Sequence, residues 1–303
     1  MKKTWIVGSR GSKLALLQTQ IVVDLLNKAH PTSVFSVKTI TTKGDTVWDR
    51  PLHLIGGKGL FVKEIEEELL KATIDFAVHS MKDMPTELDQ GLAIGAVIKR
   101  EDPRDVFLSL KHEKFSDVPA GGKIGTNSLR RQSQILHLRK DVHVIPIRGN
   151  VDTRIRKMEL LNLDGIILAY AGVVRMGFES HIKEVLPLEM MVPPSGQGAI
   201  GIETRNQNDL LSILKPINDV VSSREVSIER LVQMQIGGGC NVPLGINASI
   251  DKDTLTIHVA FGREDGEMLM RDRQKGDIKR SQEMILTAAA TVNDWRKKMP
   301  LNG

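Results

Sequence analysis

The stretch WIVGSRGSKLALLQTQIVVDLL (residues 5–26) indicates the fold class, because a short apolar run passes through a polar junction into a helical pattern. Trp5–Val7 is apolar, as a buried strand would be, and the junction Gly8–Ser12 follows it directly. Ser12 is a residue type that commonly caps a helix N-terminus. We expect the helix after it to carry one apolar face, formed by Leu14, Leu17, Ile21 and Leu25.

The same order of strand, polar junction and helix returns further along the chain. A strand at Lys123–Gly125 leads to a helix that begins near Leu129. A strand at Val142–Ile147 leads to a helix after Asp152, and a third strand, Gly165–Leu168, also precedes a helix. This repetition predicts an α/β fold in which parallel sheets are flanked by helices.

Breaks in composition divide the chain into three predicted domains. A charged, proline-containing break at residues 99–103 and a proline- and glycine-rich one at 192–198 delimit two lobes around a cleft. Beyond Pro216 the pattern changes, which predicts a smaller α+β domain. Its expected elements are a helix at Val226–Gln235, strands at Leu244–Ile250 and Leu255–Phe261, and a closing helix at Ser281–Lys297.

Composition restricts the compartment and the partners. The 303 residues include one cysteine, so an internal disulfide is excluded, which fits a reducing compartment. The apolar run behind the basic start is too short for a signal peptide, and no run approaches the ~20 apolar residues of a membrane span. We therefore expect a soluble, cytoplasmic protein without a membrane partner. The net charge of +5 favours an anionic ligand, while an aromatic content of 4% disfavours a base-stacking nucleic-acid platform.

Polar side chains gather at the predicted strand-to-helix junctions, where open parallel sheets bind their ligands. These residues are Arg10, Ser12, Lys82, Asp83, Thr126, Ser128, Arg130, Arg131, Arg148, Arg154 and Arg175. Any one of the arginines, taken alone, is best explained as a surface residue on a first helical turn. Five junctions with the same character indicate a site for several anionic groups, which helix N-termini and arginine forks both favour. The pattern does not separate phosphate from carboxylate.

The segment HSMKDMP (residues 79–85) follows an apolar strand and ends at a proline. We interpret His79 as a structural residue and place Asp83 in the cleft, where a carboxylate holds N–H groups and stabilises a developing cation. The glycine-rich segment GGKGLF (residues 56–61) lacks the P-loop pattern, so it does not indicate an ATPase. Residues 45–59 are instead expected to form a mobile lid with Lys58 and Phe61 at its edge.

Cys240 follows three glycines and precedes a proline by three residues, which describes a tight, irregular loop. A lone cysteine is usually a small buried hydrophobe. In such a loop it is instead able to reach a cleft and form a covalent bond. No second cysteine or clustered histidine accompanies it, so we expect no metal site.

Together these segments resemble the porphobilinogen deaminase family, in order and over nearly the whole chain. The matching segments are GSRGSKLA (8–15), TKGD (42–45), GKGLF (57–61), HSMKDMP (79–85), GTNSLRR (125–131), RGNVDTR (148–154), GQGA (196–199) and GGC (238–240). Three departures accompany the match: Asn241 stands where the family usually has glutamine, Pro194-Ser195 replaces alanine and an apolar residue, and Gly237 adds a third glycine.

The resemblance implies a transferase that joins four porphobilinogen molecules head to tail, releases ammonia at each step and hydrolyses off hydroxymethylbilane. It implies a dipyrromethane cofactor on Cys240 through a thioether, so that this cysteine is a tether and not a turnover nucleophile. Asp83 corresponds to the family's catalytic aspartate and would stabilise the cationic azafulvene-like intermediate. Each pyrrole unit carries an acetate and a propionate, which gives the arginines a reason to gather.

By the same resemblance, cofactor and substrate binding falls to Arg10, Ser12, Lys58, Phe61, Lys82, Thr126, Ser128, Arg130, Arg131, Arg148, Arg154, Arg175 and Gln197. The implied fold has two lobes like type II periplasmic binding proteins and a third, smaller α+β domain with the cysteine loop. The expected boundaries are residues 1–98 with 195–215, then 103–192, then 218–303. We expect a monomer.

Two other functions are compatible with parts of the sequence. A non-catalytic two-lobed binding protein for a small anion would explain the arginines, but it leaves the glycine-flanked Cys240 without a role. A nucleic-acid-binding protein would fit the sequence pI of about 9.2, but no helix-turn-helix or RNA-binding signature is present. We therefore expect no nucleic-acid partner.

Overall fold

The computed structural model describes residues 4–42, 62–237 and 242–298. The chain folds into two compact units. Unit 1 holds the described residues up to Glu101 together with Gly198–Arg224, and unit 2 holds Asp102–Gln197 and the described residues from Glu225 onward. The described residues form three sheets, one in unit 1 and two in unit 2. The α/β class predicted from the sequence is confirmed, whereas the boundaries of three separate domains stay a prediction.

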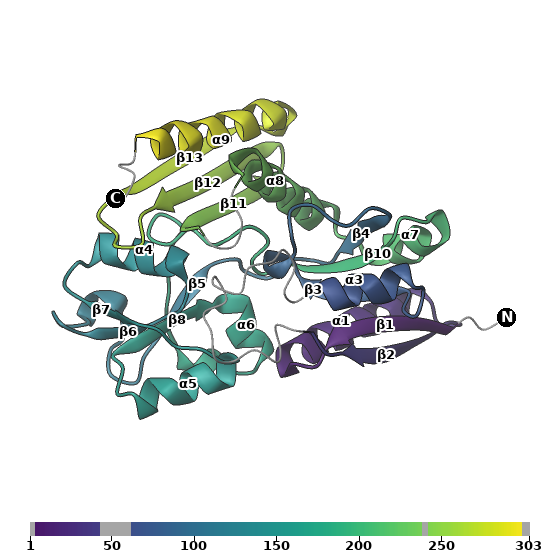
Figure 1. Ribbon diagram of the computed structural model, residues 1–303, viewed down its shortest axis with the longest axis horizontal. Helices are drawn as coiled ribbons and strands as arrows, with labels where there is room; N and C mark the ends of the chain where they lie inside the picture. Colours follow the sequence, from purple (N-terminus) through teal and green to yellow (C-terminus); the bar gives the residue numbers. More distant parts are fainter. Residues whose placement is uncertain (1–3, 43–61, 238–241, 299–303) are drawn as a thin grey trace. The chain divides into compact units, whose positions relative to one another are not determined.

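Unit 1 is built on a five-stranded sheet in the order β2-β1-β3-β10-β4 (Figure 1). Its strands are β1 (Thr4–Arg10), β2 (Val34–Ile40), β3 (Phe76–Ser80), β4 (Leu92–Val97) and β10 (Ile200–Arg205). Its helices are α1 (Lys13–Ala29), α3 (Lys63–Leu70), α7 (Asn208–Leu214) and the first residues of α8 (Val220–Ile236). Strand β1 pairs in parallel with β2 and β3, while β10 is antiparallel to both of its neighbours.

Helix α1 begins as predicted, because the Ser12 side chain accepts a hydrogen bond from the Ala15 N–H at 3.3 Å. Its buried face is not the predicted one. Leu17 and Ile21 are 36% and 38% exposed, and the buried residues are Gln18, Thr19, Val22, Val23 and Leu26. Polar partners explain the difference: the Ser80 hydroxyl donates to Gln18 Oε1 at 3.0 Å, and the hydroxyls of Thr19 and Ser9 are hydrogen bonded at 2.7 Å.

The first sheet of unit 2 has the order β7-β6-β8-β5-β9. Its strands are β5 (Asp105–Leu108), β6 (Lys123–Gly125), β7 (His143–Ile145), β8 (Gly165–Ala169) and β9 (Ile182–Val185). Three helices accompany it: α4 (Leu129–Leu138), α5 (Val151–Leu160) and α6 (Tyr170–Arg175). Strand β6 is parallel to β7 and β8, and β5 is antiparallel to β8 and β9. In both five-stranded sheets, therefore, one antiparallel strand stands in the fourth position, which the prediction of purely parallel sheets did not include.

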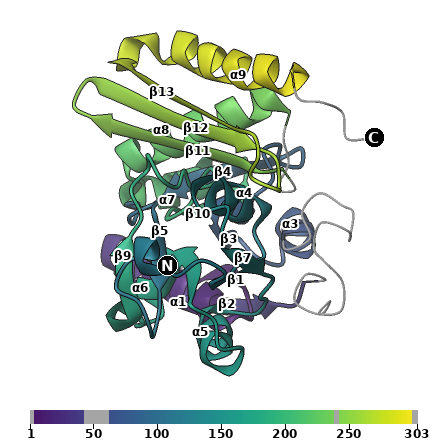
Figure 2. The same cartoon turned by 90° about the vertical axis from the view of Figure 1, so that its left-hand side faces the viewer.

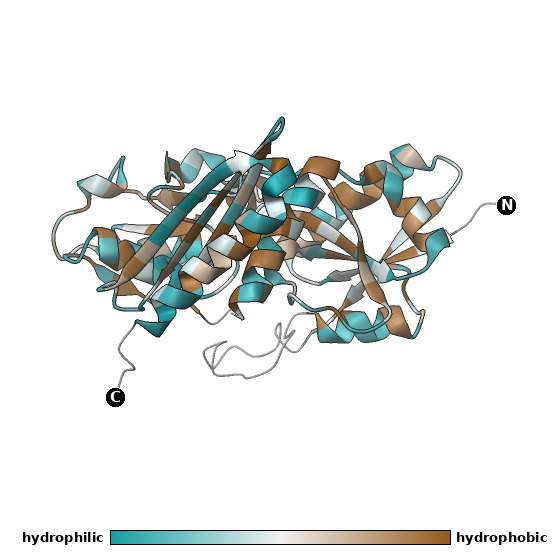
Figure 3. Ribbon diagram, turned by 90° about the horizontal axis from the view of Figure 1, so that it is seen from above, coloured by the Kyte–Doolittle hydropathy of each residue, from teal (hydrophilic) through white to brown (hydrophobic). Residues whose placement is uncertain are grey.

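The second sheet of unit 2 is antiparallel and contains β11 (Leu244–Asp251), β12 (Thr254–Gly262) and β13 (Leu269–Asp277). Helix α9 (Ser281–Lys297) lies along it, as Figure 2 shows, and packs on β12 and β13. Apolar residues of α8, α9, β11 and β12 share one buried core. Figure 3 shows hydrophobic and hydrophilic residues alternating along these elements, as expected when each buries one face. Strand β13 was not predicted, since its sequence LMRDRQKGD is mostly polar.

Candidate functional site

In unit 1, the predicted site residues lie where two neighbouring parallel strands end. Arg10 is the last residue of β1, and β3 runs into a 3-10 turn, η2 (Met81–Asp83), that carries Lys82 and Asp83. Strands β1 and β3 pair directly, with Gly8 opposite Ala77. The structure therefore brings Arg10 and the η2 turn to the same edge of the sheet. Asp83 is exposed, and Lys82 and Arg10 are half-buried.

The η2 turn is fixed to strand β10. The Met81 N–H donates to the Ala199 carbonyl at 3.0 Å, and the Met81 side chain is 2% exposed. Gly201 leaves the room that this side chain occupies, because a Cβ there would lie 2.1 Å from Met81 Sδ. The turn that presents Asp83 is thus held by a backbone hydrogen bond on one side and close packing on the other.

In unit 2, Arg130 and Arg131 lie in the first turn of α4, whose N-terminus is capped by Ser128. The helix begins at Leu129, as predicted, and the Ser128 hydroxyl accepts from the Arg131 N–H at 3.4 Å. Both arginine side chains are buried, at 5% and 6% exposure, and both contact Asp105. Arg130 Nη2 lies 2.8 Å from Asp105 Oδ2, and Arg131 Nη2 lies 2.7 Å from Oδ1.

Asp105 was not predicted as a site residue, although it organises this part of unit 2. Its carboxylate is 0% exposed and also accepts from Gln197 Nε2 at 2.9 Å. The same Gln197 nitrogen donates to the Pro103 carbonyl at 2.7 Å. An aspartate at the start of an apolar strand gives no sign in the sequence of partners that lie 25, 26 and 92 positions away.

The positive charges of Arg130 and Arg131 keep the buried carboxyl group of Asp105 ionised. Burial opposes ionisation of Asp105, but the attraction of Arg130 and Arg131 outweighs it and holds the pKa of the carboxyl well below its usual range. Burial lowers the pKa of Arg130 to about 10 despite the Asp105 carboxylate, so its guanidinium stays charged at neutral pH. The cluster therefore carries two positive charges and one negative charge.

The remaining predicted residues of unit 2 follow the other parallel strands. Thr126 follows β6 and is buried, with its hydroxyl accepting from the Ser128 N–H at 3.2 Å. Arg148 lies between β7 and α5, and Arg154 in α5 donates through Nε to the Gly149 carbonyl at 2.7 Å. Arg175 ends α6, the helix that follows β8. Arg148, Arg154 and Arg175 are all half-buried.

Three predicted residues, Lys58, Phe61 and Cys240, lie outside the described residues. Within the described ranges, no group of three or more His, Cys, Asp and Glu side chains is arranged to hold a metal ion. None of the described helices has the length and apolar character needed to cross a membrane.

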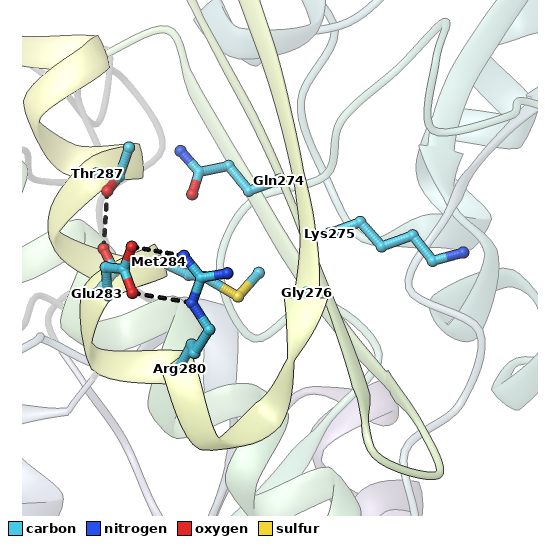
Figure 4. Close-up of a pocket in the computed structure, with 7 residues that line it drawn as sticks. All are labelled: Gln274, Lys275, Gly276, Arg280, Glu283, Met284 and Thr287. Atoms are coloured by element: carbon cyan, nitrogen blue, oxygen red, sulfur yellow. Dashed lines mark hydrogen bonds and ion pairs between the residues drawn. The ribbon is translucent and has the colours of Figure 1, made fainter.

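A surface pocket between β13 and α9 contains none of the predicted site residues (Figure 4). It is lined by Gln274, Lys275, Gly276, Arg280, Glu283, Met284 and Thr287. On the α9 side of the pocket, Arg280 and Glu283 form an exposed ion pair with a closest distance of 2.7 Å. The pocket thus offers a salt-bridged surface and not a concentration of cations.

Comparison with known proteins identifies the family. The family model for the "Porphobilinogen deaminase, dipyromethane cofactor binding domain" matches residues 5–212, and that for the "Porphobilinogen deaminase, C-terminal domain" matches residues 223–294. A porphobilinogen deaminase of Carboxydothermus hydrogenoformans is 47% identical over 95% of this chain and 93% of its own length. Another, from Brevibacillus brevis, is 46% identical over 90% of this chain and 89% of its own length.

Solved structures with a similar course of the chain include binding proteins. One is a nutrient binding protein from Burkholderia cenocepacia bound to methionine, with a TM-score of 0.44 and 11% identity over 77% of this chain and 97% of that chain. Another is a TRAP periplasmic solute binding protein from Desulfovibrio salexigens, with a TM-score of 0.45 and 8% identity over 75% of this chain and 74% of that chain. The family models and the curated relatives cover both units. These matches show that this chain belongs to the porphobilinogen deaminase family.

Proposed function

We propose that this protein is a hydroxymethylbilane synthase, a transferase that acts as a cytoplasmic monomer. It joins four porphobilinogen molecules on a dipyrromethane primer held by Cys240, releases one ammonia per molecule, and hydrolyses off the linear tetrapyrrole. The observation that carries the proposal is the placement of arginine and hydroxyl side chains after parallel strands in both units.

The residues present fit a group that carries several carboxylates. Arginine pairs with carboxylates through a planar fork of N–H donors, and the hydroxyls of Ser12 and Ser128 stand at helix N-termini, where anions are favoured. When bound, the dipyrromethane supplies the pyrrole carbon that the first substrate joins. Its acetate and propionate groups are assigned to Arg131, Arg148, Arg154 and the other residues predicted for binding.

Arg130 and Arg131 have different parts in this proposal. Arg130 donates to Asp105 at 2.8 Å and to the Val192 carbonyl at 2.7 Å. Its main part is therefore to hold the start of α4 in place. Arg131 turns Nε and Nη2 towards a single oxygen of Asp105, which orients the guanidinium. We assign to Arg131 the direct contact with a ligand carboxylate and to Asp105 and Gln197 the task of orienting it.

Asp83 is assigned the chemical role. Its exposed carboxylate, on a turn fixed by Met81, accepts hydrogen bonds from pyrrole N–H groups and stabilises the positive charge that develops as ammonia leaves. Ammonia would depart with the electrons of the substrate's C–N bond, and the pyrrole carbon supplied by the bound cofactor would give up its proton as the new C–C bond forms. Lys82 and Arg10, at the same sheet edge, bind the carboxylates of the incoming substrate.

The ratio of products tests this function. Purified protein is supplied with porphobilinogen, and ammonia and uroporphyrinogen-type tetrapyrrole are quantified together. Four ammonia molecules per tetrapyrrole are expected. Porphobilinogen binding without ammonia release would support a small-anion binding protein and contradict the proposal.

A further inference from the structure

Unit 1 buries a second group of ionisable side chains that the proposed reaction does not use. His79 on β3, Glu203 on β10 and Glu66 on α3 are 5%, 0% and 5% exposed. His79 Nε2 lies 3.1 Å from Glu203 Oε2. Since Gly201 is opposite His79 and Glu203 is opposite Ala77, both side chains lie on one face of the sheet. Helix α3 packs on β3, β4 and β10 in this unit (Figure 1).

The surroundings of these three side chains are mostly apolar. Ile65, Leu69, Ala77 and Leu92 form the adjoining buried cluster. Neither oxygen of Glu203 makes a hydrogen bond within the described part of the chain, and the same holds for Glu66 Oε1. Two buried carboxylates that act on each other and lack donors would repel each other, so the arrangement favours a proton on one of them.

Other charged groups near α3 do not neutralise the pair. Arg205 extends from β10 towards the end of α3, where its Nη1 donates to the carbonyls of Leu69 and Ile74 at 2.7 Å each. Its Nη2 lies 3.3 Å from Asp75, so its charge is already compensated there. Asp89, in the segment before β4, adds a further negative charge that acts on Glu66. Of the groups named here, His79 lies within ion-pair distance of Glu203, at 3.1 Å.

Glu66 is the carboxyl that takes the proton. Burial raises its pKa to about 7, and repulsion from Glu203 and Asp89 acts in the same direction. A proton on Glu66 relieves its repulsion with Glu203. The cluster then combines a neutral acid with a second carboxyl group and a histidine in a buried space.

The cluster adjoins the turn that carries Asp83 through His79. His79 precedes Ser80, the last residue of β3, and η2 begins at the next position. The His79–Glu203 contact links β3 to β10 two residues before Met81. Met81 is held by the Ala199 carbonyl, just before β10, and by the space at Gly201 in β10. The strand end that places Asp83 is thus held by Ala199, Gly201 and Glu203.

We propose that His79, Glu203 and Glu66 form a buried proton-holding cluster that positions the Asp83 turn for deamination. The inference rests on the role proposed above for Asp83. The three residues act as positioning residues, since none of them lies on the exposed side of the turn. A small displacement of a catalytic carboxylate lowers the rate of reaction more than it lowers substrate affinity.

Glu203→Gln and His79→Gln, each prepared as the cofactor-loaded enzyme, remove the ionisable group from one partner and keep its approximate size. For each variant we expect kcat to fall about tenfold or more while KM changes by less than about twofold. Thr204→Val is the matched control. Thr204 neighbours Glu203 on β10, is 0% exposed and donates to the Asp75 carbonyl at 2.8 Å. The Thr204 side chain faces the other side of the sheet, where Gly95 and Leu214 lie. Loss of its hydroxyl should therefore lower the thermal midpoint of unfolding and leave kcat unchanged.

The proton on the buried cluster can be detected without an assay of enzyme activity. The wild-type protein at pH 6 should show the infrared C=O band of a protonated, buried carboxylic acid, and Glu66→Gln should lack it. Absence of that band from the wild type would overturn the proton-holding cluster. An unchanged kcat in both the Glu203 and His79 variants would overturn the positioning role while leaving the proposed function intact.

Two further outcomes separate the inference from the proposed function. If the wild type forms no tetrapyrrole from porphobilinogen, the proposed function fails whatever the infrared band shows. If both cluster variants fail to fold while Thr204→Val folds, the cluster serves folding alone and the positioning role is overturned.

Discussion

The Asp105 carboxylate, 0% exposed, lies 2.7 Å from the guanidinium of Arg131, and this contact links the start of β5 to the start of α4. Arg130 binds the second oxygen of the same carboxylate. An arginine held from behind by a buried carboxylate keeps its orientation, because its side chain cannot rotate without breaking a charge-assisted hydrogen bond. The ion pair thus supports both the fold of unit 2 and the presentation of Arg131.

Asp105→Asn leaves two buried guanidinium groups with one acceptor fewer and no compensating charge. We expect a loss of roughly 3–5 kcal/mol in the free energy of unfolding at pH 7, measured by urea denaturation. Because the pKa of Asp105 is lowered in the fold, its stabilisation is present above the ordinary aspartate pKa of 3.8 and is lost as the pH falls below it. The difference between variant and wild type should therefore shrink at pH 3.

Asp141→Asn is the control for this experiment. Asp141 is 44% exposed and pairs with Arg139 at 2.7 Å on the surface of the same unit. Because water screens this exposed pair, we expect Asp141→Asn to lower the free energy of unfolding at pH 7 far less than Asp105→Asn does. Equal losses for Asp105→Asn and Asp141→Asn would show that burial of the Asp105 pair is not energetically important.

Glu66→Gln should change the dependence of stability on pH in the sense opposite to that expected for Asp105→Asn. Because the pKa of Glu66 is raised to about 7 in the fold, the wild type loses stability as the pH rises from 4.5 towards 7. The size of this loss is on the order of 3 kcal/mol, and the variant should not show it. Urea denaturation at pH 5 and pH 8 measures both proteins. Parallel pH profiles would mean that Glu66 titrates normally.

Gly201→Ala should displace the Asp83 turn by steric contact. The added Cβ would lie 2.1 Å from Met81 Sδ, so the Met81 side chain or the turn must move. We expect kcat to fall about tenfold or more with the cofactor still attached, measured by tetrapyrrole formation. Gly276→Ala in β13 is the control, since its Cβ would lie 3.2 Å from Sδ of Met284 on α9 and needs only a small adjustment. Equal activities of the two variants would contradict the claim that the packing of Met81 against Gly201 positions the Asp83 turn.

Asp83→Ala should fold normally and lose nearly all turnover. Asp83 is exposed and the turn is held by Met81, so the substitution removes a carboxylate without opening the core. Asp24→Ala, which removes an exposed carboxylate from α1, should retain wild-type activity. The measurement is single-turnover ammonia release together with the thermal midpoint. Near-wild-type release from Asp83→Ala would remove this residue from its assigned role.

The sequence predicted the parts of the fold that depend on local patterns. The cap at Ser12, the helix start near Leu129 and the strands that lead into these helices could be read directly, because capping and periodicity act over a few residues. The antiparallel strands β5 and β10 could not, since their neighbours in the sheet are set by pairing with distant segments. The predicted buried face of α1 was wrong at Leu17 and Ile21, because the residues buried in this helix include Gln18 and Thr19, which have polar partners.

The candidate site was predicted unevenly for a similar reason. Arginines after strands are visible in the sequence, and the structure places Arg10 beside the Asp83 turn and Arg130 beside Arg131. The buried partners Asp105 and Glu203 were missed, because a single acid in or before an apolar strand reveals neither its burial nor its partner. Such groups are found only when the fold brings distant residues together.

Covalent attachment of dipyrromethane to Cys240 is the feature on which the proposed reaction depends, and the intact mass of the purified protein tests it. We expect the wild type to exceed the mass of its sequence by two deaminated porphobilinogen units and Cys240→Ala to have the mass of its bare sequence. A wild type with the mass of the bare sequence that also fails to gain mass when porphobilinogen is added would contradict it.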